Sequence, residues 1–243
     1  MSTEARPAFY ALAPGGWRDY VTLLHPPYTL WHLSYVVIGA TLAPDWRPGR
    51  LVATLAAFFL AVGIGAHALD ELNGRPLSTR IPSRILGTIS VLSITAAVGI
   101  GIAGAVALDP WLLAFVAPGA FIVFAYNLEL VGGRLHTDTW FALAWGAFPL
   151  LTSYFASAEK LRGEALLAGA FAALLTYAQR KLSSPARMLR RRVADVSGVL
   201  ELKDGRREPI TRETLIAAPE AALRALTAAV IALAVALVML RVS

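Results

Sequence analysis

The feature that most constrains this chain is a series of long apolar runs, separated by short charged or Pro- and Gly-rich connections. A hydrocarbon core of about 30 Å is crossed by about 20 helical residues, and the runs have that length. Seven membrane-spanning helices are therefore predicted, at 28–44, 51–73, 85–107, 110–131, 138–157, 164–182 and 220–241. We expect an all-α, polytopic membrane helical bundle that forms a single integral membrane domain over residues 1–243.

Composition excludes several other classes of protein. Hydrophobic residues make up 57% of the chain and charged residues 16%, whereas soluble domains carry about 25% charged residues. A separate soluble catalytic domain is therefore not expected. The chain has no cysteine, which excludes disulfides, thiolate metal ligands and a cysteine nucleophile. The net charge of +6 reports membrane orientation rather than a nucleic-acid partner.

The distribution of Lys and Arg predicts the orientation. Most of them lie in the N-terminal segment and in the loops after the second, fourth and sixth predicted spans. The opposite face has only Arg47, Arg50, Lys160, Arg162 and Arg241. Because positive loops stay in the cytoplasm, the N-terminus should be cytoplasmic, and an odd number of spans places the C-terminus outside.

The segment 183–219 is predicted to be a cytoplasmic insertion. Residues 183–200 are too charged to cross lipid, and their apolar side chains alternate with arginines, as in a helix that lies at the membrane interface. Asp204-Gly205 between two extended runs indicates a β-hairpin. We expect this hairpin to cover the cytoplasmic face of the bundle and Pro219 to lie in the first turn of the last helix.

Polar residues gather at the cytoplasmic ends of the predicted helices. His67, Asp70 and Glu71 follow helical spacing and share one helix face. All four histidines, His25, His32, His67 and His136, fall toward the same side. Ionisable groups at this depth usually face a cavity or a partner. Simpler interpretations are a salt-bridge belt for Asp70 and Glu71, an aromatic interface belt around His32, and contacts of Arg190 to Arg192 with anionic lipids.

Residues 65–81, which read GAHALDELNGRPLSTRI, resemble the first aspartate-rich signature of the UbiA-type intramembrane prenyltransferases. That signature is Asn-Asp-x-x-Asp-x-x-x-Asp followed by Arg-Pro-Leu. Residues 126–138 and 144–150 are similar to the family's Tyr-bearing helix end, cytoplasmic loop and Gly/Pro-rich helix. The resemblance implies a bundle of up to nine helices around a cavity that opens to the cytoplasm. In the family, two acidic motifs there hold Mg²⁺ and the diphosphate of an isoprenoid donor.

The sequence departs from the family signature at several positions. Asp70 matches the middle aspartate, whereas Ala66, His67 and Gly74 replace the other polar positions. The second acidic motif should lie near 177–187, and that segment contains no Asp or Glu. A standard two-motif Mg²⁺ cluster is therefore not expected.

The favoured hypothesis is a UbiA-like transferase that moves an isoprenoid group from a prenyl diphosphate to a small or lipid acceptor. Asp70, Glu71 and His67 would be catalytic, with Mg²⁺ as the suspected cofactor. Arginines would supply charge that Mg²⁺ otherwise carries. The predicted substrate-binding residues are Arg75, Arg80, Tyr126, Arg134, Gln179, Arg180 and Arg187.

Two other functions stay open. One is a metal-dependent membrane enzyme, in which zinc or iron is held by imidazoles and carboxylates. Its ligands would come from Asp70, Glu71, His67, His136 and Asp138. The other is a non-catalytic lipid-binding, isoprenoid-binding or transport protein with the same fold.

Overall fold

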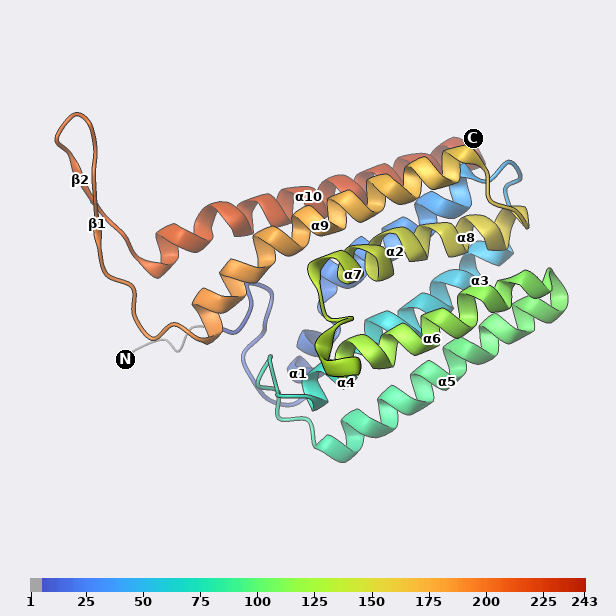
Figure 1. The fold of residues 1–243 in the computed structure, drawn as a ribbon, viewed down its shortest axis with the longest axis horizontal. Helices are drawn as coiled ribbons and strands as arrows, with labels where there is room; N and C mark the ends of the chain where they lie inside the picture. Colours follow the sequence, from blue (N-terminus) through green and yellow to red (C-terminus); the bar gives the residue numbers. More distant parts are fainter. Residues whose placement is uncertain (1–5) are drawn as a thin grey trace.

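The computed structural model describes residues 6–243 and is mostly helical, with 74% helix (Figure 1). A short helix, α1 (Trp17–Leu23), precedes α2 (Pro26–Leu42). The next helix is continuous from Pro48 to Leu72. It consists of α3 (Pro48–Phe58), the π-helical segment η1 (Phe59–Ala66) and α4 (His67–Leu72).

The remaining elements are helices and one hairpin. After α5 (Ser83–Ala107), a short 3₁₀ turn at Pro110–Leu112 leads into α6 (Leu113–Asn127), and a second turn lies at Val131–Gly133. A further continuous helix contains α7 (Asp138–Ala142), the π-helical segment η4 (Leu143–Ala147) and α8 (Phe148–Ala158). The chain closes with α9 (Gly163–Arg191), β1 (Val199–Glu201), β2 (Arg207–Pro209) and α10 (Arg212–Val242).

The structure confirms a mostly helical protein with several helices that could span a membrane. Within residues 6–243, five helices are long and apolar enough to cross a membrane. They span Pro48–Leu72, Ser83–Ala107, Pro110–Asn127, Asp138–Ala158 and Arg212–Val242. The predicted segments 28–44 and 164–182 also lie in helices, α2 and α9, but these two are not among the five. The segment predicted at 110–131 ends as a helix at Asn127.

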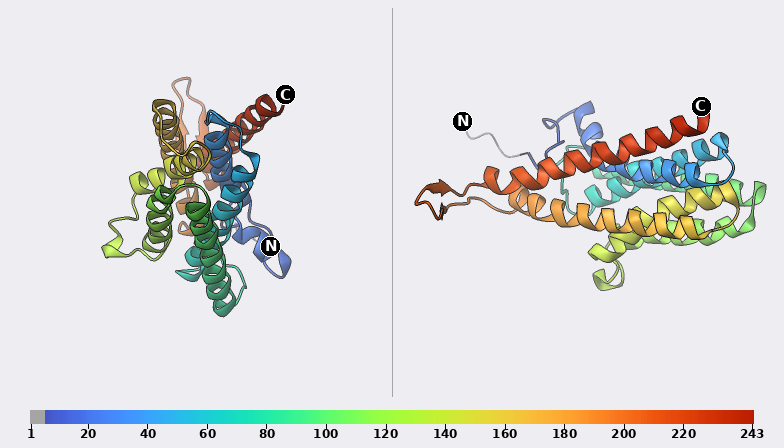
Figure 2. Two further views of the ribbon diagram at one scale, coloured as in Figure 1. Left: turned by 90° about the vertical axis from the view of Figure 1, so that its right-hand side faces the viewer. Right: turned by 90° about the horizontal axis from the view of Figure 1, so that it is seen from above.

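Helix α2 lies inside the bundle, between α8 and α10 (Figures 1 and 2). Trp31 and Tyr35 on α2 are fully buried, with Leu150 of α8 in the same core cluster. A side chain at Gly39 would collide with the carbonyl oxygen of Leu150. This glycine therefore allows α2 and α8 to approach closely, as small residues do between membrane helices.

Helix α2 has 17 residues and occupies the middle of the bundle. Its neighbours α9 and α10 run side by side along one edge, and α5 packs against α6 on the other side (Figures 1 and 2). The two ends of the described chain lie at opposite ends of the bundle (Figure 1). Arg190 donates to the Arg6 carbonyl at one end, and Arg241 donates to the Thr41 carbonyl at the other.

The prediction of a separate interfacial helix over 183–200 is wrong. Helix α9 continues through Pro185 to Arg191, because Ser183 and Ala186 are buried against the rest of the protein. Helix α10 begins earlier than expected, where Thr211 forms a capping box with Thr214. Pro219 therefore lies inside α10 and not in its first turn.

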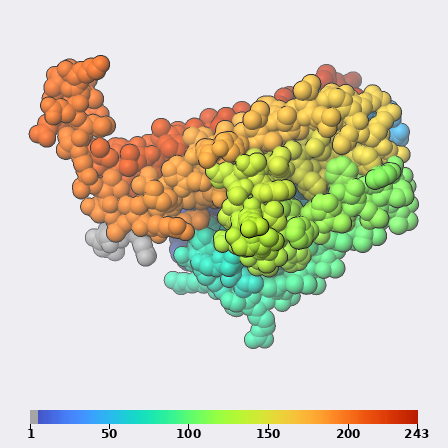
Figure 3. All heavy atoms as spheres, viewed as in Figure 1, coloured from blue at the N-terminus to red at the C-terminus, as the bar shows by residue number. Residues whose placement is uncertain are grey.

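The predicted β-hairpin is confirmed, but its predicted position is not. β1 and β2 pair antiparallel, with Val199 opposite Pro209, and Gly205 in the turn has a φ of 84°. Positive φ at this position suits glycine. The hairpin projects away from the bundle, and both strands are exposed (Figures 1 and 3). It therefore does not cover the polar cavity described below.

Candidate functional site

A polar cavity of about 440 Å³ lies among α2, α4, α6, α7 and α9. All four histidines line it, together with Asp70 and three arginines of α9, Arg180, Arg187 and Arg191. The chain thus brings side chains from distant segments to one site, as the sequence suggested. His25 immediately precedes α2 and His32 lies within it, whereas His67 begins α4 and His136 lies before α7.

Backbone carbonyls orient three of these histidines. Nδ1 of His67 lies 3.1 Å from the Gly63 carbonyl oxygen in η1, and Nδ1 of His32 lies 2.7 Å from the Trp145 carbonyl oxygen in η4. Nδ1 of His136 lies 3.0 Å from the Tyr126 carbonyl oxygen. Because a carbonyl only accepts, each Nδ1 must carry the proton, which leaves Nε2 as an acceptor or base. Two of these carbonyls belong to π-helical segments, which often occur at functional sites.

Aromatic rings form the walls around the histidines. The rings of His25 and His67 stack with centroids 4.1 Å apart, and those of Tyr126 and His136 stack at 4.2 Å. Trp145 lies beside Tyr126 at 4.6 Å. His32 is therefore buried and lines the cavity. It does not belong to an aromatic belt at the membrane interface, which was the simpler interpretation.

Asp70 and Glu71 have different environments although they are adjacent. Asp70 lines the cavity, and its carboxylate has no hydrogen bond or ion pair within residues 6–243. Glu71 is fully buried and accepts hydrogen bonds from the Leu77 backbone, at 2.9 Å, and from the Thr79 backbone and hydroxyl. Glu71 therefore closes the turn after α4 and does not face the cavity, and the two carboxylates do not form a salt-bridge belt.

The arginines also divide into two groups. Arg75 donates to the Thr79 carbonyl and the Ser83 hydroxyl and so stabilises the loop before α5. Neither Arg75 nor the expected Arg80 and Arg134 line the cavity. The arginines that line it are Arg180 and Arg187 of α9, which were predicted, and Arg191 of α9 and Arg192 just after it, which were not.

Sequence reasoning missed Arg191 because α9 was expected to end at 182. The helical spacing between Arg187 and Arg191 was the available signal, since residues four apart share a helix face. Arg190 lies on another face and forms two hydrogen bonds with the buried Glu220, at 2.6 and 2.9 Å. Arg190 thus forms an ion pair inside the protein with Glu220 and does not make the lipid contact that was considered.

The five proposed metal ligands do not come together. Asp138 pairs with Arg180 at 3.1 Å and with Lys181 at 2.6 Å, and it does not line the cavity. Glu71 is held in its turn, as described above. Across residues 6–243, no three His, Asp or Glu side chains are grouped so that they could hold a metal ion.

The charge of the lining favours an anion. Asp70 and Glu129 are the carboxylates that line the cavity, against the guanidinium groups of Arg180, Arg187, Arg191 and Arg192. Arg187 has one hydrogen bond, a long one of 3.5 Å to the Ser184 hydroxyl, and no ion pair among the described residues. A half-buried guanidinium without a carboxylate partner suits a site that binds phosphate.

Three lining residues also leave a buried polar atom without a partner within residues 6–243. These atoms are His25 Nε2, the Tyr126 hydroxyl and Gln179 Oε1. Buried polar atoms are nearly always hydrogen-bonded in folded proteins, so each exception calls for an explanation. A bound polar ligand would satisfy them.

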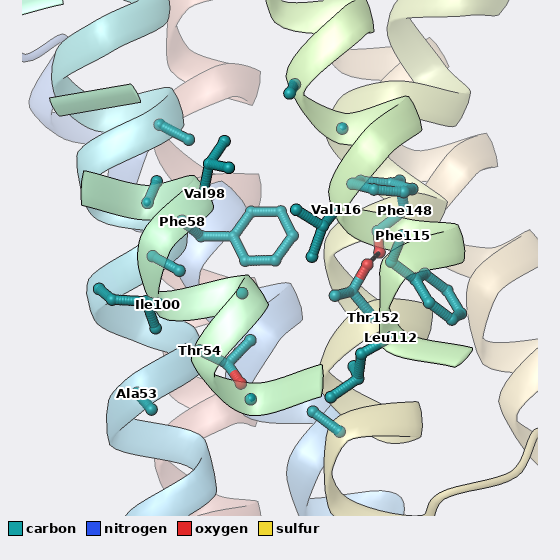
Figure 4. A pocket seen from close by; sticks show the side chains of 18 of the residues that line it. Ala53, Thr54, Phe58, Val98, Ile100, Leu112, Phe115, Val116, Phe148 and Thr152 are labelled. Carbon is teal, nitrogen blue, oxygen red and sulfur yellow. Dashed lines mark hydrogen bonds between the residues drawn. The ribbon is translucent and has the colours of Figure 1, made fainter. Parts of the chain in front are cut away.

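A second, apolar chamber of about 470 Å³ lies next to the polar cavity, between α3, α5, α6 and α8. Its walls include Phe58, Val116 and Phe148 (Figure 4). Trp145 lines both spaces, and on η1 Val62 lines the chamber while Ala66 lines the cavity. The two spaces therefore share Trp145 as a wall residue, and one is polar and cationic while the other is apolar.

No protein-family model, curated protein or solved structure matches this chain. Its function is accordingly argued from the residues of the cavity and the chamber.

Proposed function

We propose that this chain is a UbiA-like membrane transferase with seven membrane-spanning helices, which moves an isoprenoid group from a prenyl diphosphate to a small or lipid acceptor. The observation that carries the proposal is that Trp145 lines both the cationic cavity and the apolar chamber. A prenyl diphosphate has the same two parts, a highly charged head and a hydrocarbon tail. The head would bind in the cavity and the tail in the chamber.

The α9 arginines would bind the diphosphate. Arg180, Arg187 and Arg191 line the cavity from one helix, and planar guanidinium groups form paired hydrogen bonds with phosphate oxygens. Arg180 is also held over the Phe141 ring at 4.9 Å and by its ion pair with Asp138. These contacts fix one arginine in advance and leave Arg187 free to engage the ligand.

The chemistry would be an alkyl transfer. The bond between the allylic carbon and the bridging oxygen breaks, and diphosphate leaves with the electron pair. The arginines stabilise the negative charge that develops on the leaving group. A nucleophilic atom of the acceptor forms a bond to the allylic carbon and loses its proton to Asp70 or to Nε2 of His67, which lie on the same face of α4.

The residues that line this cavity give little support to Mg²⁺, the cofactor suspected from the resemblance. Mg²⁺ prefers carboxylate oxygens, and the lining offers Asp70 and Glu129 among four arginines. Zinc or iron is supported no better, because the expected ligands do not form a group. In the proposal, the arginines therefore balance the charge of the diphosphate, and no step depends on a metal.

A second candidate is a non-catalytic isoprenoid- or lipid-binding protein. The specific observation in its favour is the composition of α9, where Gln179, Arg180 and Arg187 stand in the segment that should hold the family's second acidic motif. Such a protein would bind the same ligand and leave its C–O bond intact.

The experiment that tests the proposal measures binding of the diphosphate head and of the isoprenoid tail separately. Purified protein in nanodiscs is titrated with farnesyl diphosphate and with inorganic diphosphate. Arg187→Gln should weaken both ligands by about tenfold or more, because a charge-assisted hydrogen bond is lost. Val116→Trp should fill the chamber and weaken only the prenyl ligand. Arg207→Gln, on the exposed hairpin, is the matched control and should bind as the unmodified protein does.

Release of diphosphate then separates the two candidates. The transferase releases diphosphate from the prenyl donor and yields a prenylated product when membrane lipid extract supplies the acceptor. Tight binding without release would support the non-catalytic candidate. If farnesyl diphosphate does not bind, both candidates fail.

A further inference from the structure

The N-terminal segment of residues 6–16 is fixed on the bundle at the polar cavity. Ala8 and Ala11 form an apolar cluster with Leu77, and Phe9 lies under the Arg224 guanidinium at 5.1 Å. Arg191 donates to the Pro7 carbonyl oxygen at 3.2 Å. Contacts to α9 and α10 thus set the position of this segment, although it contains no helix or strand.

Tyr10 of this segment reaches the cavity residue His25. The Tyr10 hydroxyl lies 2.7 Å from Nδ1 of His25, and this is its one hydrogen bond within residues 6–243. Nδ1 is the one acceptor that this half-buried hydroxyl has within residues 6–243, so the O–H donates and Nδ1 accepts. Nδ1 of His25 is therefore unprotonated, and the neutral ring carries its proton on Nε2.

His25 is in this respect the opposite of the other three histidines. His32, His67 and His136 donate through Nδ1 to carbonyl oxygens, whereas His25 accepts at Nδ1. Its Nε2–H has no partner within residues 6–243. The cavity thus contains three acceptor imidazoles and a single donor imidazole.

The backbone at His25 adds an independent observation. His25 adopts a left-handed conformation, with φ 46° and ψ 57°, immediately before Pro26. This conformation is uncommon for a residue with a side chain and costs free energy, and such residues cluster at functional sites. The strain places the His25 ring between Tyr10 and the His67 ring.

We infer that Tyr10 is a positioning residue, which holds His25 in the tautomer that donates from Nε2 to a phosphate oxygen of the ligand. The identity of the ligand rests on the proposed function, whereas the pairing of Tyr10 with His25 does not. The N-terminal segment is then part of the binding site. His25 and the α9 arginines supply hydrogen-bond donors, and Asp70, His32 and His67 supply acceptors.

Imidazole nitrogen spectroscopy tests the tautomer directly. The chain has four histidines, so selective ¹⁵N-histidine labelling gives four rings, which His→Gln variants assign. We expect His25 to carry its proton on Nε2 and the other three on Nδ1. Tyr10→Phe should shift the His25 Nδ1 resonance, because the hydrogen bond is lost. A His25 protonated on Nδ1 in the unmodified protein would overturn the inference.

Binding of inorganic diphosphate tests the role of the pair. Tyr10→Phe should weaken it by about tenfold, as expected for a hydrogen bond to a charged group. His25→Gln keeps an N–H donor and should retain most of the affinity, whereas His25→Leu should lose it. In the His25→Gln background, Tyr10→Phe should have no further effect. Unchanged affinity in Tyr10→Phe or His25→Leu would contradict the role given to the pair.

These outcomes separate this inference from the proposed function. If His25 and Tyr10 contribute to diphosphate binding but no isoprenoid is transferred, the inference stands and the transferase fails. If the unmodified protein binds no diphosphate, the ligand assigned to His25 is wrong together with the proposed function.

Discussion

Glu71 accepts hydrogen bonds from the backbone N–H and the hydroxyl of Thr79, at 2.8 and 2.9 Å. This contact joins α4 to the loop that precedes α5 and removes Glu71 from the cavity. Successive residues of a helix point in different directions, so Asp70 faces the cavity while Glu71 faces its own loop. Of these two adjacent carboxylates, Glu71 therefore holds a loop and Asp70 lines the cavity.

Glu71→Gln should destabilise the protein. The carboxylate is fully buried and accepts three hydrogen bonds, and the amide can replace only part of them. Loss of charge-assisted hydrogen bonds in a buried site costs about 2–3 kcal/mol. Thermal unfolding in detergent should show a lower Tm, and Glu208→Gln on the exposed hairpin should not. A Tm equal to that of the unmodified protein would refute the structural role of Glu71.

Asp70→Asn should abolish isoprenoid transfer and change the stability little. The Asp70 carboxylate has no partner to lose within residues 6–243, and the substitution removes a base of the proposed reaction. Diphosphate release and Tm are measured together, with Asp45→Asn at an exposed position as the control. Full activity in Asp70→Asn would remove Asp70 from the mechanism.

Much of this site follows from helical spacing in the sequence. The apolar runs marked the helices, and the Asp204-Gly205 turn predicted the hairpin. His67 and Asp70 could be placed on one face because residues three apart on a helix are neighbours. That the four histidines line one cavity confirms the gathering expected from their positions.

The errors come from interactions that a local sequence pattern does not contain. Arg75 was assigned to a phosphate because arginines bind phosphate, yet the loop carbonyls of Thr79 and Ile81 use its donors. The predicted end of α9, at residue 182, is too early because the prediction required a segment apolar enough to cross lipid, and the charged end of the helix is not. Burial of Ser183 and Ala186 on its inner face extends it, and long-range packing of this kind overrides local composition.

Single-cysteine labelling should determine the orientation in the membrane. The chain has no cysteine of its own, so Ser78→Cys and Lys160→Cys, both at exposed positions, can be labelled one at a time. Positive loops should be cytoplasmic, so an impermeant reagent outside the cell should label Cys at 160 and not at 78. Labelling of both positions from the same side would contradict the seven-span arrangement.

Acid should destabilise the protein through His25. Burial, and then the neighbouring His67, lower the pKa of His25 well below 6.5. In the unfolded state the His25 imidazole is protonated as the pH falls through about 6.5, whereas in the folded state it stays neutral at that pH. Below that pH the unfolded state binds more protons, so stability falls as the pH falls from about 6.5 toward the folded-state pKa, and it is full above 6.5.

The measurement is Tm between pH 8 and pH 5. The unmodified protein should lose stability below about pH 6.5, and His25→Gln should lose less because it has no imidazole to protonate at this position. His32 and His67 also line the cavity, so some pH dependence should persist in the variant. An identical pH profile in His25→Gln would mean that His25 is protonated equally easily in the folded and unfolded states, and its burial beside His67 would then have no energetic consequence.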